Sequence, residues 1–233
     1  MIDIALLSKK YGEQTVLDID DLQIPSGQTF GLVGNNGAGK TTLFSLILDL
    51  IEPTTGAVKN KGIVVAEDER WKNHTAAFVD EQFLIGYLTP EEYFFFIGGL
   101  RGMTKEAVRT ALERYSDFFH GEVLGQKKYI RDLSKGNQKK VGIVGTLISD
   151  TPIVILDEPF ANLDPTTQIR LKHLLKQEAS VTKKTFLISS HDLQHVTEVC
   201  DRIVVLHKGK MVRDVTTNAS TLKELEQFFL EQL

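Results

Sequence analysis

Short apolar runs, separated by turns and amphipathic stretches, recur along this chain. Five of them have the length and apolar content of buried strands: Thr29–Val33, Ala76–Val79, Ile153–Leu156, Thr185–Ser189 and Ile203–Leu206. Continuous short apolar runs are typical of strands covered on both faces, which predicts a parallel sheet. Ahead of them, looser patterns at Ile2–Leu7 and Thr15–Ile24, with a turn at Lys9–Glu13 between them, predict a small antiparallel β layer.

The segment before the Ala76 strand is less regular. Pro53 and Gly56 indicate a turn, and residues 62–66 suggest another short strand. We interpret the polar run 67–73 as an exposed loop or a connection between strands. It contains Trp71, for which core packing and stacking on a ligand are both open.

From about Gly86 the pattern becomes helical. Thr89-Pro90-Glu91-Glu92 predicts a capped helix start with proline at the first helical position. Thr104 is expected to cap a second helix, and 133–137 opens a third. Strands alternating with helices, interrupted by a helix-only stretch, predict one α/β domain with a helical insert. Its core spans 1–85 and 150–220, the helical subdomain about 86–149, and a C-terminal helix about 221–233.

The composition limits the classes of function that the chain can have. The 233 residues carry a formal net charge of −4, which gives no general attraction to nucleic acid, and no nucleic-acid partner is expected. The single cysteine, Cys200, excludes an intrachain disulfide and suits a reducing, cytoplasmic setting. No apolar run approaches the roughly eighteen residues of a membrane span, and the start of the chain lacks a signal core. Any work at a membrane is therefore expected to go through a partner.

A glycine-rich stretch between the Thr29–Val33 strand and a predicted helix at 42–50 carries the strongest chemical signal. It has the P-loop (Walker A) spacing of glycine, four residues, Gly-Lys-Thr, in the strand–loop–helix context that this motif requires. The predicted phosphate cradle comprises Gly34, Asn35, Asn36, Gly37, Ala38, Gly39, Lys40, Thr41 and Thr42. Backbone N–H groups and the helix N-terminus favour phosphate there, with Lys40 on the β/γ-phosphates and the Thr41 hydroxyl on Mg²⁺.

Two further positions follow apolar strands at the edge where open α/β sheets bind ligands. Asp157, after Ile153–Leu156, is expected to bind Mg²⁺ directly or through water, and Glu158 to face an attacking water. The alternative without a functional role is that the strand simply ends in a charged turn. His191, just past Thr185–Ser189, is either a surface residue or a group that orients the γ-phosphate and the water.

Together these motifs resemble the ATP-binding subunit of an ABC transporter, over nearly the whole chain and in the family's order. The signature position reads Leu133-Ser134-Lys135-Gly136-Asn137, with Lys135 and Asn137 where the commonest family form has a second glycine and glutamine. Lys135 resembles the subfamily that pairs with exporters of the ABC-2 type. The resemblance implies a P-loop NTPase (RecA-like) core with an antiparallel β layer and an inserted α-helical subdomain, and ATP and Mg²⁺ as ligands.

The resemblance also implies individual roles. Tyr11 corresponds to the aromatic that stacks on adenine, with Val16 beside it. Glu158 corresponds to the catalytic base and His191 to the switch histidine. The residues expected to meet ATP across a head-to-tail dimer interface are Ser134, Lys135, Gly136, Asn137 and, in the Asn162-Leu163-Asp164 loop, Asp164.

One family position departs from the usual pattern. The family's metal-binding glutamine after the Ala76–Val79 strand is replaced by the run Asp80-Glu81-Gln82. Either Asp80 or Glu81 fills the position, and we assign Asp80 to the metal. A carboxylate there is expected to bind Mg²⁺ through water.

The function expected from the resemblance is an ATP hydrolase that powers transport, with export favoured by Lys135. The expected partners are a second copy of the chain and integral membrane permease subunits, which would hold it peripherally on the inner face of the cell membrane. Two alternatives remain open: a soluble ABC-type ATPase of translation or DNA maintenance, and a non-catalytic ATP-binding switch.

Overall fold

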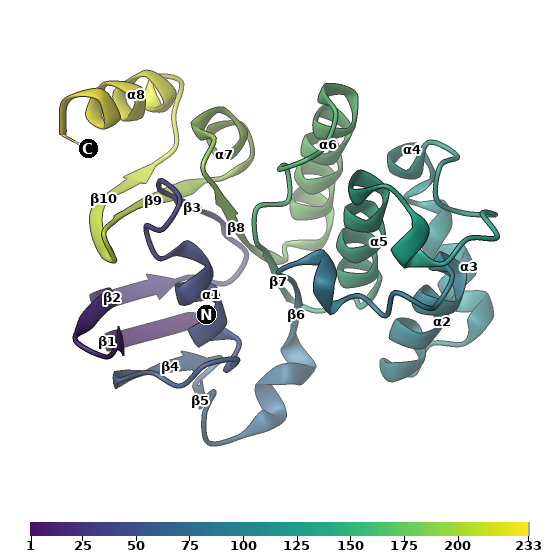
Figure 1. Cartoon of the computed structure of the whole chain (residues 1–233), viewed down its shortest axis with the longest axis horizontal. Helices are drawn as coiled ribbons and strands as arrows, with labels where there is room; N and C mark the ends of the chain where they lie inside the picture. Colours follow the sequence, from purple (N-terminus) through teal and green to yellow (C-terminus); the bar gives the residue numbers. More distant parts are fainter. Residues whose placement is uncertain (233) are drawn as a thin grey trace.

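The computed structural model describes residues 1–232, which form two sheets and a separate helical lobe (Figure 1). Within these residues a four-stranded sheet has the order β2-β1-β4-β5, and a six-stranded sheet has the order β10-β9-β3-β8-β7-β6. The strands of the smaller, antiparallel sheet are β1 (Ile2–Tyr11), β2 (Gln14–Ile24), β4 (Thr55–Asn60) and β5 (Ile63–Val64).

The larger sheet is parallel from β9 to β6, and only its edge strand β10 runs antiparallel to its neighbour. Its strands are β3 (Thr29–Val33), β6 (Thr75–Phe78), β7 (Ile153–Leu156), β8 (Thr185–Ser190), β9 (Arg202–His207) and β10 (Lys210–Thr216). Each of β3, β7 and β8 is buried along its whole length, as its continuous apolar sequence predicts.

The helices connect and cover these strands (Figure 1). The α-helices are α1 (Lys40–Ile47), α2 (Pro90–Leu100), α3 (Lys105–Glu113), α4 (Ser116–Phe119), α5 (Lys135–Ile148), α6 (Pro165–Thr182), α7 (Leu193–Val199) and α8 (Thr221–Gln232). Three short 3-10 helices span Glu69–His74, Glu81–Phe83 and Ile130–Asp132 in the described part of the chain. No helix within residues 1–232 has the length and apolar character that crossing a bilayer requires.

The alternation of side chains along the central strands divides the core. On β7, Ile153 and Ile155 pack with α1 and the antiparallel sheet, whereas Val154 and Leu156 pack with the α5, α6 and α7 side. Successive strand residues face opposite sides, so each strand serves both halves of the core. The P-loop helix α1 is thereby held between two sheets.

The helical lobe is formed by α2 to α5, on the right of Figure 1. The predicted capping box is confirmed: the Glu92 backbone N–H donates to Thr89 Oγ1, and the Thr89 N–H donates to Glu92 Oε2 at 2.8 Å. Thr104 caps α3 by accepting a hydrogen bond from the Ala107 N–H. Several aromatic side chains of the lobe, such as Phe94 and Phe119, are buried core residues, whereas Phe96 is exposed.

Two local predictions were wrong. Gly56 lies inside strand β4, where an added Cβ would collide with the Leu6 carbonyl oxygen of a bulge in β1, so glycine marks close strand contact there and not a turn. Strand β1 continues through Lys9 to Tyr11, and its polar end is an exposed part of the outer sheet. The 67–73 segment is, as predicted, a mostly exposed connection between strands β5 and β6. It contains a 3-10 helix, and its Trp71 is buried and donates Nε1–H to the Val65 carbonyl, which supports core packing for this side chain.

Candidate functional site

The order of the central strands brings the separate motifs to one edge of the sheet. Val33, the last residue of β3, pairs with Ser190 of β8, and Leu156, the last residue of β7, pairs with Ile188. The P-loop, the end of β8 and the Asp157-Glu158 pair therefore follow three adjacent parallel strands at their carboxyl ends. This is the edge where open α/β sheets bind ligands.

The P-loop has the backbone of an anion cradle. Gly39, the N-cap of α1, has φ of 110°, and Gly37 has φ of 80°, conformations that favour glycine. A Cβ at Gly34 would collide with the Leu206 carbonyl oxygen, because β9 and β10 close tightly over the loop. Lys40 is buried, and its Nζ donates to the Gly34 carbonyl at 2.7 Å. The loop is thus folded for ligand contact through backbone N–H groups.

A hollow of about 330 Å³ opens over this loop. Its lining combines the P-loop with a side chain from β2 and one from the turn after β7; the residues are Val16, Asn36, Gly37, Ala38, Gly39, Lys40, Thr41, Thr42 and Glu158. The predicted neighbour of adenine, Val16, therefore borders the same space as the phosphate cradle.

Asp157 is buried beside the P-loop and held by two hydroxyls. The Thr41 hydroxyl donates to Asp157 Oδ2 at 2.6 Å, and the Ser189 hydroxyl donates to Oδ1. Burial raises the pKa of the Asp157 carboxyl, while the hydrogen bonds from Ser189 and Thr41 act in the opposite direction. A carboxylate and a hydroxyl oxygen in contact are the kind of donor set that Mg²⁺ prefers.

Glu158 joins the P-loop to the end of β8. Its Oε1 lies 3.1 Å from Lys40 Nζ, and its Oε2 lies 2.9 Å from Nδ1 of His191. The Lys40 contact is ionic rather than a well-aligned hydrogen bond, since Oε1 has no hydrogen-bond partner among residues 1–232. Glu158 also has φ of 45°, a strained conformation for a non-glycine residue, and its N–H donates to Ser189 Oγ at 2.8 Å.

The signature residues lie away from the P-loop hollow. Ser134 caps α5, and its hydroxyl accepts a hydrogen bond from the Asn137 N–H at 3.3 Å. A Cβ on Gly136 would lie 3.6 Å from the Asn162 carbonyl oxygen, so the signature borders the Asn162-Leu163-Asp164 loop. Ser134 and Lys135 are exposed. Within one copy, none of 134–137 lines the P-loop hollow.

Asp164 has a local role that its sequence position also predicts. It caps α6, accepting hydrogen bonds from the Thr167 N–H at 3.0 Å and the Thr167 hydroxyl at 2.5 Å. These bonds lower the pKa of the Asp164 carboxyl. The preceding Asn162 has φ of 61°, which turns the loop sharply ahead of the helix.

Two predicted site residues stand apart from this hollow. Tyr11 is 56% exposed, with Lys9 Nζ 5.0 Å from the centre of its ring. Asp80 accepts a hydrogen bond from the Gln82 N–H at 2.8 Å, and in residues 1–232 no hydrogen bond joins it to Thr41 or Asp157. Its metal role stays a prediction.

The ABC transporter family profile matches residues 17–161, from β2 past the Asp157-Glu158 pair. The chain belongs to the ABC transporter family. An uncharacterized ABC transporter ATP-binding protein, YhaQ of Bacillus subtilis (strain 168), is 35% identical over 237 residues, which cover 98% of this chain and 74% of YhaQ. The bacitracin transport ATP-binding protein BcrA of Enterococcus faecalis is 32% identical over 233 residues, 99% of this chain and 73% of BcrA.

A solved structure of similar fold is the dimeric MJ0796, described as a bacterial ABC transporter cassette. It has a TM-score of 0.84 and 27% identity, over 94% of this chain and 100% of that one. The fold class and the family resemblance are thereby confirmed. This ATP-binding subunit binds ATP and hydrolyses it, as its family does. The relatives give no support to the alternative in translation or DNA maintenance.

Other polar residues that have no predicted role hold the site together. Ser189 bridges Asp157 and the Glu158 N–H, whereas the sequence pattern predicts only that it lies in a strand. A signal existed, because Ser189 and Ser190 end an apolar strand just before His191. Gln138 and Lys139 follow the signature in a polar run, and both are buried.

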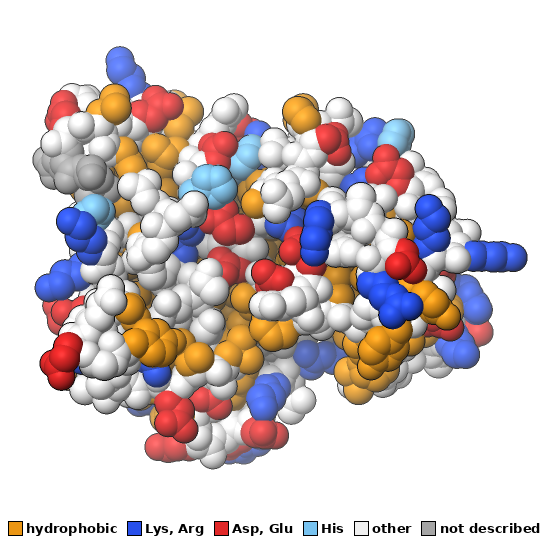
Figure 2. Space-filling view, viewed as in Figure 1, with side chains coloured by type: hydrophobic (Ala, Val, Ile, Leu, Met, Phe, Trp, Pro, Cys, Tyr) orange, Lys and Arg blue, Asp and Glu red, His pale blue; other side chains and the backbone are white. Residues whose placement is uncertain are grey.

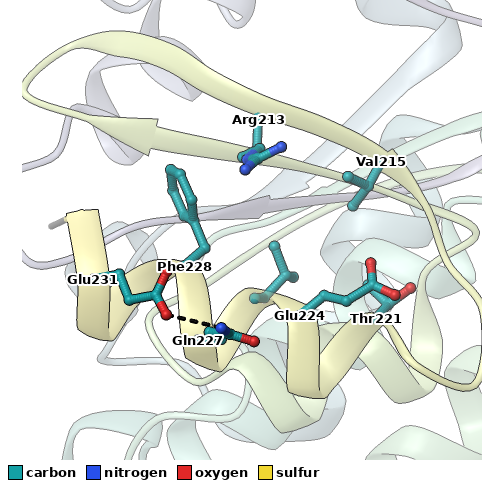
Figure 3. Close-up of a pocket in the computed structure, with 8 residues that line it drawn as sticks. Arg213, Val215, Thr221, Glu224, Gln227, Phe228 and Glu231 are labelled. Carbon is teal, nitrogen blue, oxygen red and sulfur yellow. Dashed lines mark hydrogen bonds between the residues drawn. The ribbon is translucent and has the colours of Figure 1, made fainter.

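A hollow of about 310 Å³ between β10 and α8 shares no residue with the P-loop hollow (Figure 3). Arg213 of β10 lies over the ring of Phe228 of α8, with 4.7 Å between the guanidinium carbon and the ring centre. Gln227 donates to Glu231 at 2.8 Å along the helix. This surface is formed by the packing of the C-terminal helix and adds nothing to the ATP site.

Proposed function

We propose that this ATP-binding subunit drives export of a substrate through separate membrane-spanning subunits, with Glu158 as the catalytic base. The observation that supports the base is the contact of one carboxylate with both Lys40 and His191 at the P-loop hollow. Phosphoryl transfer depends mainly on positioning and on neutralising the charge that develops on phosphate oxygens. The P-loop N–H groups and Lys40 supply the positive charge, and Glu158 accepts a proton from the attacking water.

His191 keeps this base in position. Its Nδ1 and its backbone N–H, at 2.9 and 3.3 Å, both contact Glu158 Oε2. Lys40 contacts the other carboxylate oxygen, so a phosphate that enters the loop competes with Glu158 for the lysine. Release from Lys40 would free this carboxylate oxygen to face the attacking water.

The donor set beside the P-loop fits Mg²⁺. Thr41 and Asp157 would hold the ion, and Asp80 is a further candidate through water. The Thr41 hydroxyl and the Asp157 carboxylate, both hard oxygen groups of the kind this ion prefers, lie only 2.6 Å apart. Bound Mg²⁺ neutralises charge on the phosphates.

The exposed signature supports a head-to-tail dimer. Ser134, Lys135, Gly136 and Asn137 surround the N-terminus of α5, where free N–H groups favour an anion. Because they lie outside the hollow of their own copy, we infer that they meet the ATP held by the P-loop of a second copy. Asp164 and Tyr11 are proposed to contact nucleotide at the same interface and at the adenine end, respectively. The solved MJ0796 cassette is dimeric.

The membrane partner is proposed to bind beside the helical lobe. A largely apolar hollow of about 350 Å³ runs along the connection from β6 to α2 and includes Phe83 and Arg101. Apolar side chains also gather over the lobe near α2 (Figure 2). The large, exposed apolar residues of this region are Phe83, Tyr87, Phe96, Leu100 and Tyr129. Concentrated exposed apolar surface is typical of a protein interface, and it would hold the subunit on the inner face of the membrane.

The test is Glu158→Gln, which keeps the size of the side chain but removes the base. We expect the variant to bind ATP, to lose hydrolysis and to accumulate as an ATP-bound dimer in light scattering. Lys40→Ala is the matched control, since it should lose ATP binding and stay monomeric. Hydrolysis by Glu158→Gln at the parental rate would show that Glu158 is not the base.

A further inference from the structure

The first three residues of helix α5 are followed by three consecutive polar side chains that are all buried. Gln138, Lys139 and Lys140 are only 8%, 4% and 2% exposed. Burying a lysine is costly unless its charge is paired and its protons are accepted. The partners of these side chains therefore indicate what their burial achieves.

The Lys139 ammonium group meets three oxygen atoms: it donates hydrogen bonds to two carbonyls and makes an ionic contact with a carboxylate. Its Nζ donates to the Glu158 carbonyl at 3.0 Å and to the Ala161 carbonyl at 2.9 Å. The third oxygen is Glu81 Oε1, at 3.4 Å. Glu81 is buried around this atom, and its side chain is only 13% exposed, so the pair is shielded from water.

The two carbonyls belong to the turn that presents the catalytic base. Glu158 has positive φ, and its turn closes through a hydrogen bond from the Ala161 N–H to the Glu158 carbonyl at 3.2 Å. A strained conformation persists only when surrounding contacts enforce it. Lys139 holds both ends of this turn, while Ser189 holds the Glu158 N–H.

The neighbouring side chains Gln138 and Lys140 have different partners and different roles. Gln138 Nε2 donates to the carbonyls of Ile130, Arg131 and Leu133, and so fixes the chain leading into the signature. Lys140 forms an ion pair with Glu122 at 2.6 Å inside the helical lobe. Of the three, only Lys139 reaches the turn after β7.

We propose that Lys139 is a positioning residue for ATP hydrolysis, which fixes the backbone of Glu158 and ties it to Glu81. It acts through Glu158 and touches no substrate. Glu81 lies in the 3-10 helix between β6 and α2, beside the hollow assigned to the membrane partner. Displacement of that segment would loosen Lys139, and with it the base. The inference rests on the proposed role of Glu158.

The test compares Lys139→Met with Lys139→Arg and with Lys140→Met in the full-length chain. A misplacement near 1 Å can cost about a hundredfold in rate, so we expect Lys139→Met to lower kcat by about tenfold to a hundredfold. The KM for ATP should stay within about twofold, because the P-loop is untouched. Lys139→Arg keeps the charge and the donors and should recover much of kcat. Lys140→Met removes the ion pair between this buried lysine of the same helix and the half-exposed Glu122, and should lower Tm but leave kcat near the parental value.

Glu81→Gln provides a second measure that does not depend on Lys139→Met folding. It should lower kcat severalfold in the parental chain and have little further effect in Lys139→Met, since contacting residues are not additive. The inference is overturned if folded Lys139→Met keeps the parental kcat, or if Lys139→Met and Lys140→Met lose kcat equally. If Lys139→Met does not fold, an unchanged kcat in Glu81→Gln overturns the inference instead. If Glu158→Gln is inactive and Lys139→Met fully active, only this inference fails; if Glu158→Gln is active, the proposed function fails.

Discussion

Replacing Ser189 with alanine tests whether one buried hydroxyl organises both acidic residues of the site. Ser189 is fully buried at the end of β8. Its hydroxyl donates to Asp157 Oδ1 and accepts the Glu158 N–H at 2.8 Å. Alanine keeps the strand and removes little volume, so the main consequence is that a carboxylate oxygen and a backbone N–H lose their shared partner.

The expected cost follows from these two lost partners. A buried polar group without a hydrogen bond costs about 1–3 kcal/mol, and a charged one more. Asp157 keeps its bond from Thr41, which limits the loss at the carboxylate. We therefore expect Ser189→Ala to lower the free energy of unfolding by about 2–4 kcal/mol. In a chain of this size that corresponds to a fall in Tm of several degrees.

The assay is urea unfolding in the absence of nucleotide and divalent cation, with Ser190→Ala as the matched control. Ser190 is also buried but accepts only one hydrogen bond, from the Asp192 N–H at 3.0 Å. The Ser189 hydroxyl stabilises the ionised carboxylate, whose pKa burial raises. The cost of Ser189→Ala should therefore be smallest where Asp157 is protonated and grow as the pH rises through its pKa. Equal costs for the two variants, or no rise with pH, would refute the reasoning.

Two further substitutions test the backbone shape of the P-loop and the proposed contact of Tyr11 with adenine. Gly34→Ala places a Cβ against the Leu206 carbonyl and so displaces the loop. Because the loss of even one P-loop N–H contact is costly, the ATP affinity measured in a nucleotide-binding titration should fall more than tenfold. A soluble Gly34→Ala that binds ATP like the parent would contradict the cradle. Tyr11→Ala removes an exposed side chain, so Tm should change by less than about two degrees while the KM for ATP rises; an unchanged KM would exclude adenine stacking.

The main elements and the phosphate site were predictable because their signals are local. Apolar strands such as Ile153–Leu156, the Thr89 capping box and the P-loop spacing are each contained in a few consecutive residues. The meeting of Asp157 with Thr41 was also predictable, since both follow parallel strands at one edge. The incorrect prediction of a turn at Gly56 had the opposite cause. Gly56 lies against a bulge in β1, a strand distant in the sequence, which the local pattern does not show.

The supporting residues were not predictable for the same reason. Lys139 and Gln138 lie in a polar run that is typical of a solvated helix face. The burial of Lys139 depends on carbonyls about twenty residues away, and that of Gln138 on carbonyls up to eight residues away. A charged side chain at helical spacing usually marks a solvated face. Only the assembled fold shows that the turn after β7 lies against α5.

The apolar side chains that gather over the helical lobe also bear on how the chain must be produced. Phe83, Tyr87, Phe96 and Leu100 are exposed in a single copy, at 45% or more of their surface. Surface of this kind promotes non-specific association when no partner covers it. If the proposed membrane partner covers this surface, a subunit made in excess of that partner would leave it open to such association. Matched synthesis of the two proteins, or early assembly, would then keep the surface covered.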